Sequence, residues 1–219
     1  MWNNYFYQIR KKYSMRISTK KPLVINLDGK DITKDHNIKI LDFTEGGFLD
    51  TLEKTAQYFS RRYKCICILG ADEVSFIFED IMGLIKDINS DGSTYSSEII
   101  SVFSQYFFEY FNHFDLYRKV FWHGKCFSIE KEKVESYLKY KSKLIQVLVT
   151  TNFLKNKGIK DAGQISLPEK LKMCSNFEDY KVIKDFECGI IYKNGLRVKI
   201  DDLDNQIETN DIEIEIGDI

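Results

Sequence analysis

The sequence Val24-Ile25-Asn26-Leu27-Asp28-Gly29-Lys30 places a carboxylate at the point where a hydrophobic strand stops. A second stretch, Gly70-Ala71-Asp72-Glu73-Val74-Ser75-Phe76-Ile77-Phe78, places two carboxylates in a tight turn between hydrophobic strands. If the two strands pair side by side, Asp28 and Asp72 meet at one edge of a sheet. Clustered carboxylates repel each other, so the cluster is costly unless a cation or a shared proton neutralises it.

The residue types around this carboxylate pair favour Mg²⁺ over Zn²⁺. Oxygen atoms are the hard ligands that Mg²⁺ prefers, and neither stretch contains His or Cys. Asp28, the carbonyl of Gly29 and Asp72 are therefore the predicted metal ligands. Two Mg²⁺ ions about 3.5–4 Å apart would suit a nucleotide-transfer reaction. Gly29 would let phosphates approach the backbone, and the amides of residues 30–33 would hold phosphate oxygens.

Each motif also has a purely structural explanation. Asp-Gly after a strand is a common turn, and Asp-Glu in a hairpin is often solvated surface. Either motif alone favours that explanation. The two together, in this order along the chain, favour the metal site.

The rest of the chain predicts an α+β domain over residues 1–200. Hydrophobic periodicity predicts six elements in the order β-α-β-β-α-β of a ferredoxin-like unit. They cover residues 23–27, 48–62, 65–69, 74–78, 96–111 and 120–129. Further predictions are an N-terminal helix within residues 1–20, a Lys-rich helix over 131–157, a loop texture after Gly158, and strands 188–192 and 196–200 around Lys193-Asn194-Gly195.

Residues 201–219 form an acidic tail with eight Asp or Glu and no Lys or Arg, and its alternating end suggests an edge strand. Without it, 32 basic residues face 25 acidic ones, a net charge of +7. A basic body is compatible with RNA phosphates as partners. Scattered lysines on solvated faces explain the same excess.

Cysteine usage and hydropathy predict a cytoplasmic protein that does not span a membrane. The five cysteines are an odd number without C-x-x-C spacing. No apolar run approaches 18 residues.

Histidines, a lysine cluster and an aromatic run lead to further predictions. His113 and His123 are expected to be structural. Lys139, Lys141 and Lys143 are expected on a solvated helical face, with a phosphate track as the alternative. Within the run Tyr106-Phe107-Phe108-Glu109-Tyr110-Phe111, Phe108 or Phe111 is a candidate for a subunit interface.

Several motifs resemble the tRNA-histidine guanylyltransferase-like family, the 3′–5′ nucleotide polymerases. Leu27-Asp28-Gly29-Lys30 resembles its Leu/Ile-Asp-Gly-Arg motif, and Ala71-Asp72-Glu73-Val74-Ser75-Phe76 its Ser-Asp-Glu-Tyr-Ser-Phe motif. His36-Asn37 is similar to its His-Asn-Phe. The resemblance implies the palm fold of polymerases and nucleotide cyclases, with added helices and a C-terminal hairpin.

The resemblance also implies an activity and a set of site residues. It implies Mg²⁺-dependent addition of nucleotides from GTP or ATP to the 5′ end of RNA, as in tRNA 5′-end repair or modification, by a homotetramer. Asp28, Asp72 and Glu73 would be catalytic, with Glu73 supporting the metal site. The implied nucleotide-binding residues are Asp28, Gly29, Lys30, Asp31, Ile32, Thr33, His36, Ala71 and Asp72; for His36, a loop histidine in water is the alternative.

Departures from the family pattern affect the regions expected to recognise nucleotide and tRNA. Asn26 stands where the family usually has Arg, and the His-Ile-Asn-Asn-Leu-Tyr signature is absent from residues 140–153. We therefore expect a divergent member with another RNA or nucleotide substrate. Two alternatives stay open: a palm that synthesises a cyclic or oligonucleotide signal, and a degenerate nucleotide- or RNA-binding module.

Overall fold

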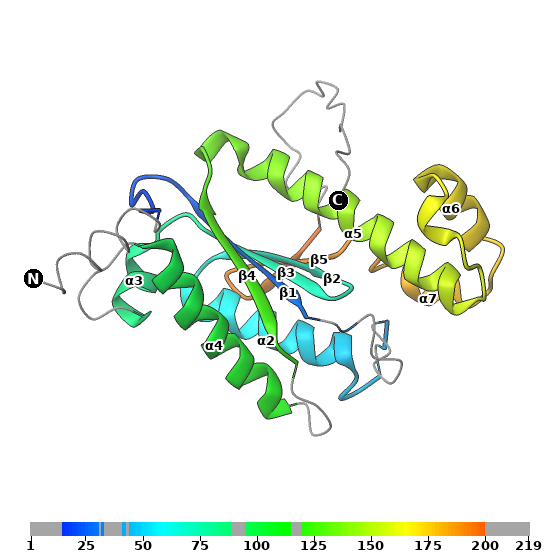
Figure 1. Ribbon diagram of the computed structural model, residues 1–219, viewed down its shortest axis with the longest axis horizontal. Helices are drawn as coiled ribbons and strands as arrows, with labels where there is room; N and C mark the ends of the chain where they lie inside the picture. The colour runs from blue at the N-terminus through cyan, green and yellow to red at the C-terminus, as the bar shows by residue number, and fades with distance from the viewer. Residues whose placement is uncertain are drawn as a thin grey trace, which may run out of the picture.

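Six strands form one antiparallel sheet in the computed structural model (Figure 1). The structure describes residues 15–30, 32, 41, 42, 44–88, 95–114 and 120–199. The order across the sheet is β4-β1-β3-β2-β5-β6. The strands are β1 (Leu23–Gly29), β2 (Ile66–Gly70), β3 (Glu73–Phe78), β4 (Trp122–Ser128), β5 (Ile190–Lys193) and β6 (Leu196–Val198).

Helices cover both faces of the sheet. Helices α2 (Phe48–Tyr63) and α4 (Ser96–Phe114) lie on one side and α5 (Val134–Asn156) on the other (Figure 1). The shorter helices are α3 (Met82–Ile88), α6 (Leu167–Cys174) and α7 (Tyr180–Lys184), and the 3₁₀ turns are η2 (Lys131–Lys133) and η3 (Ala162–Gln164). Among the described residues, no helix is both long enough and apolar enough to cross a membrane.

Aromatic side chains fill the layer between the sheet and α2 and α4. The Phe103 ring of α4 lies 5.3 Å from the rings of both Phe59 and Phe76, and all three side chains are buried. Phe107 and Phe111 of the same helix are also fully buried and pack against Trp122. Of the two candidates for a subunit interface, Phe111 therefore belongs to the core, and Phe108, which is only partly buried, stays a prediction.

Polar contacts connect the opposite face of the sheet to α5. Because side chains alternate along a strand, residues 73, 75 and 77 of β3 face away from Phe76. Ser75 donates a hydrogen bond of 2.6 Å to Asn26 of β1 and accepts one of 3.2 Å from Tyr137 of α5. The α5 face is thus partly polar where the α2–α4 face is aromatic.

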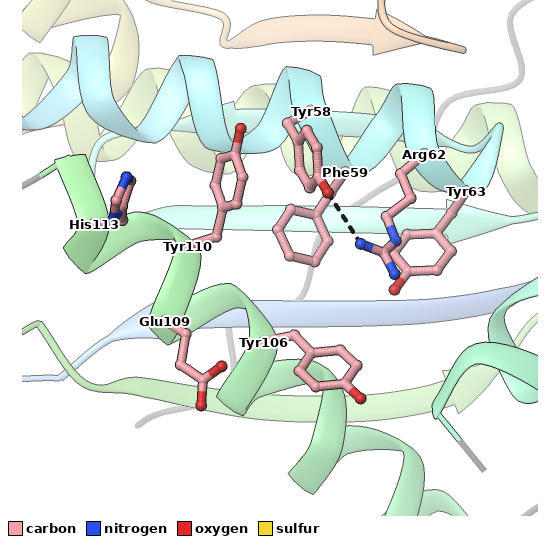
Figure 2. Close-up of a pocket in the computed structure, with 8 residues that line it drawn as sticks. All are labelled: Tyr58, Phe59, Arg62, Tyr63, Tyr106, Glu109, Tyr110 and His113. Carbon is pink, nitrogen blue, oxygen red and sulfur yellow. Dashed lines mark hydrogen bonds between the residues drawn. The ribbon is translucent and has the colours of Figure 1, made fainter. Parts of the chain in front are cut away.

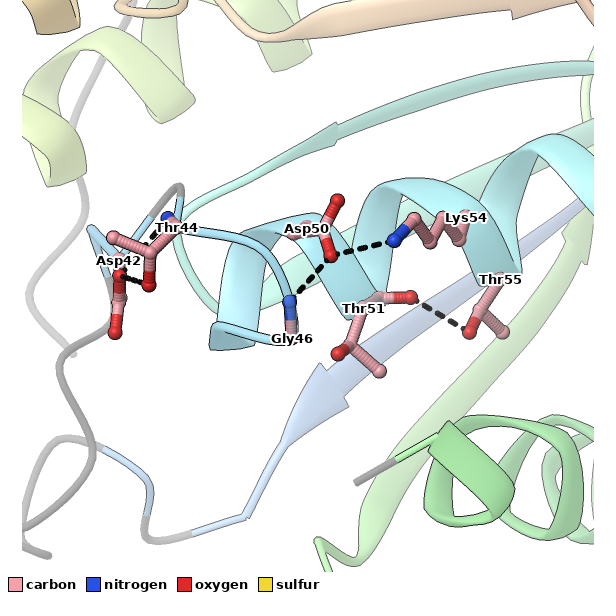
Figure 3. A network of polar contacts seen from close by, with 7 residues as sticks. All are labelled: Asp42, Thr44, Gly46, Asp50, Thr51, Lys54 and Thr55. Carbon is pink, nitrogen blue, oxygen red and sulfur yellow. Dashed lines mark hydrogen bonds and ion pairs between the residues drawn. The ribbon is translucent and has the colours of Figure 1, made fainter. Parts of the chain in front are cut away.

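A turn held by carboxylates precedes α2 (Figure 3). Asp42 accepts hydrogen bonds from the backbone N–H and the hydroxyl of Thr44, at 3.0 and 2.6 Å. Asp50 accepts bonds of 2.8 Å from the N–H of Gly46 and from Lys54. A Cβ on Gly47 would lie 2.7 Å from the Asp42 carbonyl oxygen, so glycine permits this approach. Asp42 therefore has a structural role.

The predicted order β-α-β-β-α-β is confirmed, as is the C-terminal hairpin. The loop predicted after Gly158 is wrong in part, because α6 and α7 form there. These helices have eight and five residues, too few turns for helical periodicity to stand out. The N-terminal helix lies mostly, and the acidic tail wholly, outside the described residues.

Candidate active site

The turn between β2 and β3 brings the predicted carboxylates together at one end of the sheet. Asp28 and Glu73 are register partners on the paired strands β1 and β3. Asp72 is in the turn, and its carbonyl oxygen accepts a hydrogen bond of 2.8 Å from the N–H of Gly29. The central juxtaposition predicted from the sequence is therefore present.

The two aspartates occupy different electrostatic environments. Asp72 is partly buried, and loss of water together with the negative charges of Asp28 and Glu73 raises its pKa to about 6. Asp28 keeps contact with solvent, yet the surrounding protein raises its pKa, against the opposing influence of His123, Lys141 and Lys125. The pair thus resists carrying two negative charges without a neutralising partner.

Glu73 already has a cationic partner. Its Oε2 accepts a hydrogen bond of 2.7 Å from Nζ of Lys141 on α5, and both residues are buried. The other carboxylate oxygen, Oε1, is buried and has no hydrogen-bond partner among the described residues. The prediction that Lys141 lies on a solvated face is wrong, because this position of α5 packs directly over the end of β3. Lys139 forms an i,i+4 pair with Glu135, and Lys143 is exposed.

The loop after β1 is only partly described. The N–H of Lys30 donates to the carbonyl oxygen of Phe121 at 2.8 Å, so this amide is engaged within the protein. A Cβ on Gly29 would lie 2.0 Å from Cδ1 of the buried Ile32, so Ile32 fills the space beside the glycine. The predicted nucleotide contacts Asp31, Thr33 and His36 lie outside the described residues.

Ala71 adopts a strained conformation beside the carboxylates. Its φ is 53°, in the left-handed region, which costs a non-glycine residue about 1–2 kcal/mol. Such strain collects at functional sites. Here it immediately precedes Asp72 and allows the two-residue turn that brings Asp72 next to β1.

Two residues near Asp28 were not predicted to belong to the site. His123 of β4 is the register partner of Asp28, and Lys125 is that of Asn26. Both are exposed. The sequence predicts a structural role for His123. Its position beside Asp28 depends on the long-range pairing of β4 with β1, which local sequence patterns do not indicate.

Two of the surface hollows lined by described residues lie away from the carboxylates. A groove of about 380 Å³ between α2 and α4 is lined by Tyr58, Phe59, Arg62, Tyr63, Tyr106, Glu109, Tyr110 and His113 (Figure 2). A second, of about 570 Å³, shares Arg62 and Tyr63 with it. Neither includes Asp28 or Asp72, and the first lies on the opposite face of the sheet.

The donor set for a metal is small. Within the part of the chain that the structure describes, no group of three or more His, Cys, Asp or Glu side chains is placed to hold an ion. Asp28 and Asp72 provide two carboxylates, and Mg²⁺ is usually held by one or two carboxylates, with water and substrate phosphates completing its shell. The oxygen-only donors and the mutual repulsion of the pair fit this ion.

An antiparallel sheet with α2 and α4 on one face and paired carboxylates at its end defines a palm-type α+β fold. The sequence matches no family model and no curated protein. Among solved structures, the chain is similar to a bacterial tRNA(His) guanylyltransferase-like protein in complex with GTP, at a TM-score of 0.65 and 13% identity over 87% of this chain and 83% of that one. The chain is also similar to a bacterial tRNA(His) guanylyltransferase-like protein in complex with ATP. The TM-score is 0.63 and the sequence identity is 13%, over 87% of this chain and 84% of that one.

The tRNA(His) guanylyltransferase of Saccharomyces cerevisiae is also similar, at a TM-score of 0.54 and 14% identity over 90% of this chain and 98% of that one. The similarity spans nearly the whole length of both chains. The resemblance of the sequence motifs to this family is therefore confirmed at the level of the fold.

Proposed function

We propose that this protein is a Mg²⁺-dependent nucleotidyltransferase that adds a nucleotide from GTP or ATP to the 5′ end of RNA, with tRNA as the first candidate and the cytoplasm as its compartment. The observation that carries the proposal is the Asp28–Asp72 pair at the end of the palm sheet. The pair is held by the bond from the Gly29 N–H to the Asp72 carbonyl, and repulsion within it helps to raise the pKa of Asp72. The solved structures with this fold include complexes with GTP and ATP, which supports the choice of nucleotide.

Addition at a 5′ end defines the bonds that change. The 3′-oxygen of the incoming nucleotide bonds to the α-phosphorus of a 5′-triphosphorylated RNA, pyrophosphate leaves, and the hydroxyl proton passes to solvent. Bound Mg²⁺ would supply Lewis-acid stabilisation of the reacting oxygens. Asp28 and Asp72 would hold it, and the Glu73–Lys141 pair would position the turn that carries Asp72.

The test is incorporation of an α-³²P-labelled nucleotide into a 5′-triphosphorylated tRNA transcript that lacks its first nucleotide. We expect label at the 5′ end with the wild type and a rate about 10²- to 10³-fold lower with Asp72→Ala, as for other groups that stabilise charge in a transition state. Glu79→Ala is the matched control, because Glu79 is an exposed carboxylate at the other end of β3. It should retain wild-type activity.

Other results would redirect the assignment. Full activity of Asp72→Ala would show that the carboxylate pair is not needed for the reaction. A nucleotide-only product, formed without RNA, would identify a signal-synthesising palm. The absence of any product, together with Mg²⁺-independent nucleotide binding, would identify a binding module.

A further inference from the structure

Three consecutive outward positions of β4 lie on the α5 face of the sheet, beside the candidate active site. His123, Lys125 and Phe127 are the register partners of Asp28, Asn26 and Val24 on β1. Cross-strand partners have Cβ atoms about 4.5–5.5 Å apart and point to the same face. This row therefore begins beside Asp28 and runs away from it along the sheet.

The same row is open to solvent. All three residues are exposed, and Phe127 keeps 37% of its surface accessible. Helix α5 passes over β2 and β3, where Lys141 and Tyr137 reach Glu73 and Ser75. In the order of the sheet, β4 lies beyond β1 and is the outermost of the described strands on that side. The outer part of this face is therefore accessible.

Aromatic side chains of α5 continue the row. The Tyr137 ring lies 6.0 Å from the Phe127 ring in an edge-to-face arrangement. The Tyr140 ring lies 6.5 Å from the Tyr137 ring, and 43% of the Tyr140 surface is exposed. Exposed aromatic rings beside a lysine and a histidine, on an open sheet, provide what stacked bases and their phosphates require. We define the β4 platform as His123, Lys125, Phe127 and Tyr140.

Charge also connects the platform to the carboxylates. His123 is the register partner of Asp28 and Lys125 is that of Asn26, and both residues act to lower the pKa of the Asp28 carboxyl. A polyanion approaching Asp28 and Asp72 along β4 would meet the Lys125 ammonium and the His123 imidazole first. The alternative, in which the β4 residues are ordinary solvated surface, explains the two polar side chains but not the exposed Phe127 and Tyr140 in contact with Tyr137.

We propose that the β4 platform binds the single-stranded 5′ end of the RNA substrate, with bases stacked on Phe127 and Tyr140 and phosphates at Lys125 and His123. This inference rests on the proposed function, since it places the RNA end at Asp28 and Asp72. It adds a binding surface that reaches the carboxylates from the β4 side.

The experiment measures binding of a 3′-fluorescein-labelled, 5′-triphosphorylated single-stranded 12-mer RNA by anisotropy, in the full-length chain. Phe127→Ala and Tyr140→Ala are each expected to weaken binding by about 5- to 100-fold, the loss of one stacked base. Lys125→Ala should lower the slope of log affinity against log salt by about 0.7, the release of one counterion from a single strand. Circular dichroism and thermal melting check that each variant is folded.

Matched controls are available on the opposite face and on α5. Tyr106→Ala removes an aromatic ring of 37% exposure, equal to that of Phe127, from the α2–α4 groove. Lys143→Ala removes an exposed lysine of α5. Neither should change the affinity for the 12-mer by more than about 2-fold, as expected of surface residues outside the site.

The outcomes separate this inference from the proposed function. Wild-type affinity in all three platform variants, alongside 5′ incorporation by the wild type, would overturn the inference alone. Loss of binding in these variants without any incorporation by the wild type would support the platform and overturn the proposed reaction. Equal affinity for a blunt duplex of the same length would overturn the assignment to a single strand.

Discussion

Asp72 is an acidic residue whose environment opposes its charge. Its pKa is raised from 3.8 to about 6 by burial and by Asp28, so the folded protein binds a proton there more tightly than the unfolded chain does. The protonated residue therefore favours the folded state below pH 4, and this stabilisation is lost as the pH rises through about 6. At neutral pH the charged form of Asp72 costs about 1–3 kcal/mol.

Asp72→Asn should consequently stabilise the metal-free protein at pH 7.5. We expect a gain of about 1–3 kcal/mol that declines between pH 6 and pH 4, because the wild-type carboxyl becomes neutral there. Thermal unfolding with a chelator present, at pH 7.5 and pH 4, measures this difference. Glu79→Gln should show no gain at either pH. A less stable Asp72→Asn at pH 7.5 would contradict the electrostatic explanation.

Binding of Mg²⁺ should reverse this cost at the same residue. A ligand that binds only the folded state at 100 times its Kd adds about 2.7 kcal/mol to stability. We expect saturating Mg²⁺ with GTP to raise the Tm of the wild type, and to leave the Tm of Asp28→Asn and Asp72→Asn nearly unchanged. An equal rise in Tm in all three proteins would show that the ion binds elsewhere than at Asp28 and Asp72.

The buried Glu73–Lys141 ion pair predicts that removing one charge destabilises the protein more than removing both. Lys141→Met leaves the Glu73 carboxylate buried without a cation and should cost about 3–5 kcal/mol. The double variant Glu73→Leu/Lys141→Met removes both charges and should recover most of that loss. Urea unfolding measures both, with Lys143→Met as the exposed control. Equal destabilisation in the single and double variants would show that the charge pair is not the cause.

At the scale of elements, local signals predicted most of the fold. Strands such as β1 and β3 are short apolar runs bounded by Pro22 or by the 70–73 turn, so their existence follows from nearby residues. Their pairing joins segments far apart in the chain and was expected from the β-α-β-β order. The site residues Asp28, Asp72 and Glu73 were predicted for the same reason. Their positions depend on one β-hairpin and one strand pairing.

The parts that were missed depend on long-range packing. Lys141 resembles its exposed neighbours in sequence, and only the crossing of α5 over β3 buries it. The register of β4 on β1 places His123 opposite Asp28 and Lys125 opposite Asn26, and no local sequence pattern specifies that register. Helices α6 and α7 are too short for their periodicity to be visible.

The hairpin between β5 and β6 provides a test at this scale. Asn194 and Gly195 have φ of 54° and 80°, both positive as in a type I′ turn, and a Cβ on Gly195 would lie 2.7 Å from Cβ of Arg61. Gly195→Ala should therefore cost at least about 1 kcal/mol in chemical denaturation. Gly163→Ala is the control, because Gly163 has no atom within 4 Å of an added Cβ. Equal stability of the two variants would contradict the proposed strain.

For the whole molecule, the two faces of the sheet differ in character. The α2–α4 face is closed by a continuous aromatic core around Phe59, Phe76 and Phe103. On the α5 face, helix α5 packs over Glu73 and Ser75 of β3, and this face carries the carboxylates, the Glu73–Lys141 pair and the β4 platform. The packed aromatic face holds the strands rigidly, and the polar face on the same strands carries the candidate site. A site on rigid strands keeps its geometry better than a site on loops.

The uneven distribution of charge along the chain leads to the last prediction. Residues 1–200 carry a net charge of +7 and residues 201–219 a net charge of −8, so the tail can compete with RNA phosphates for basic surface. Deleting residues 201–219 should raise the affinity for RNA several-fold at low salt, and the gain should shrink above 0.1 M salt, where the Debye length falls to about 10 Å. A tail of equal length with Asn and Gln in place of Asp and Glu separates charge from length. If deletion leaves the affinity unchanged across the salt series, the tail does not shield the body, and the net charge of +7 is by itself the relevant quantity for RNA binding.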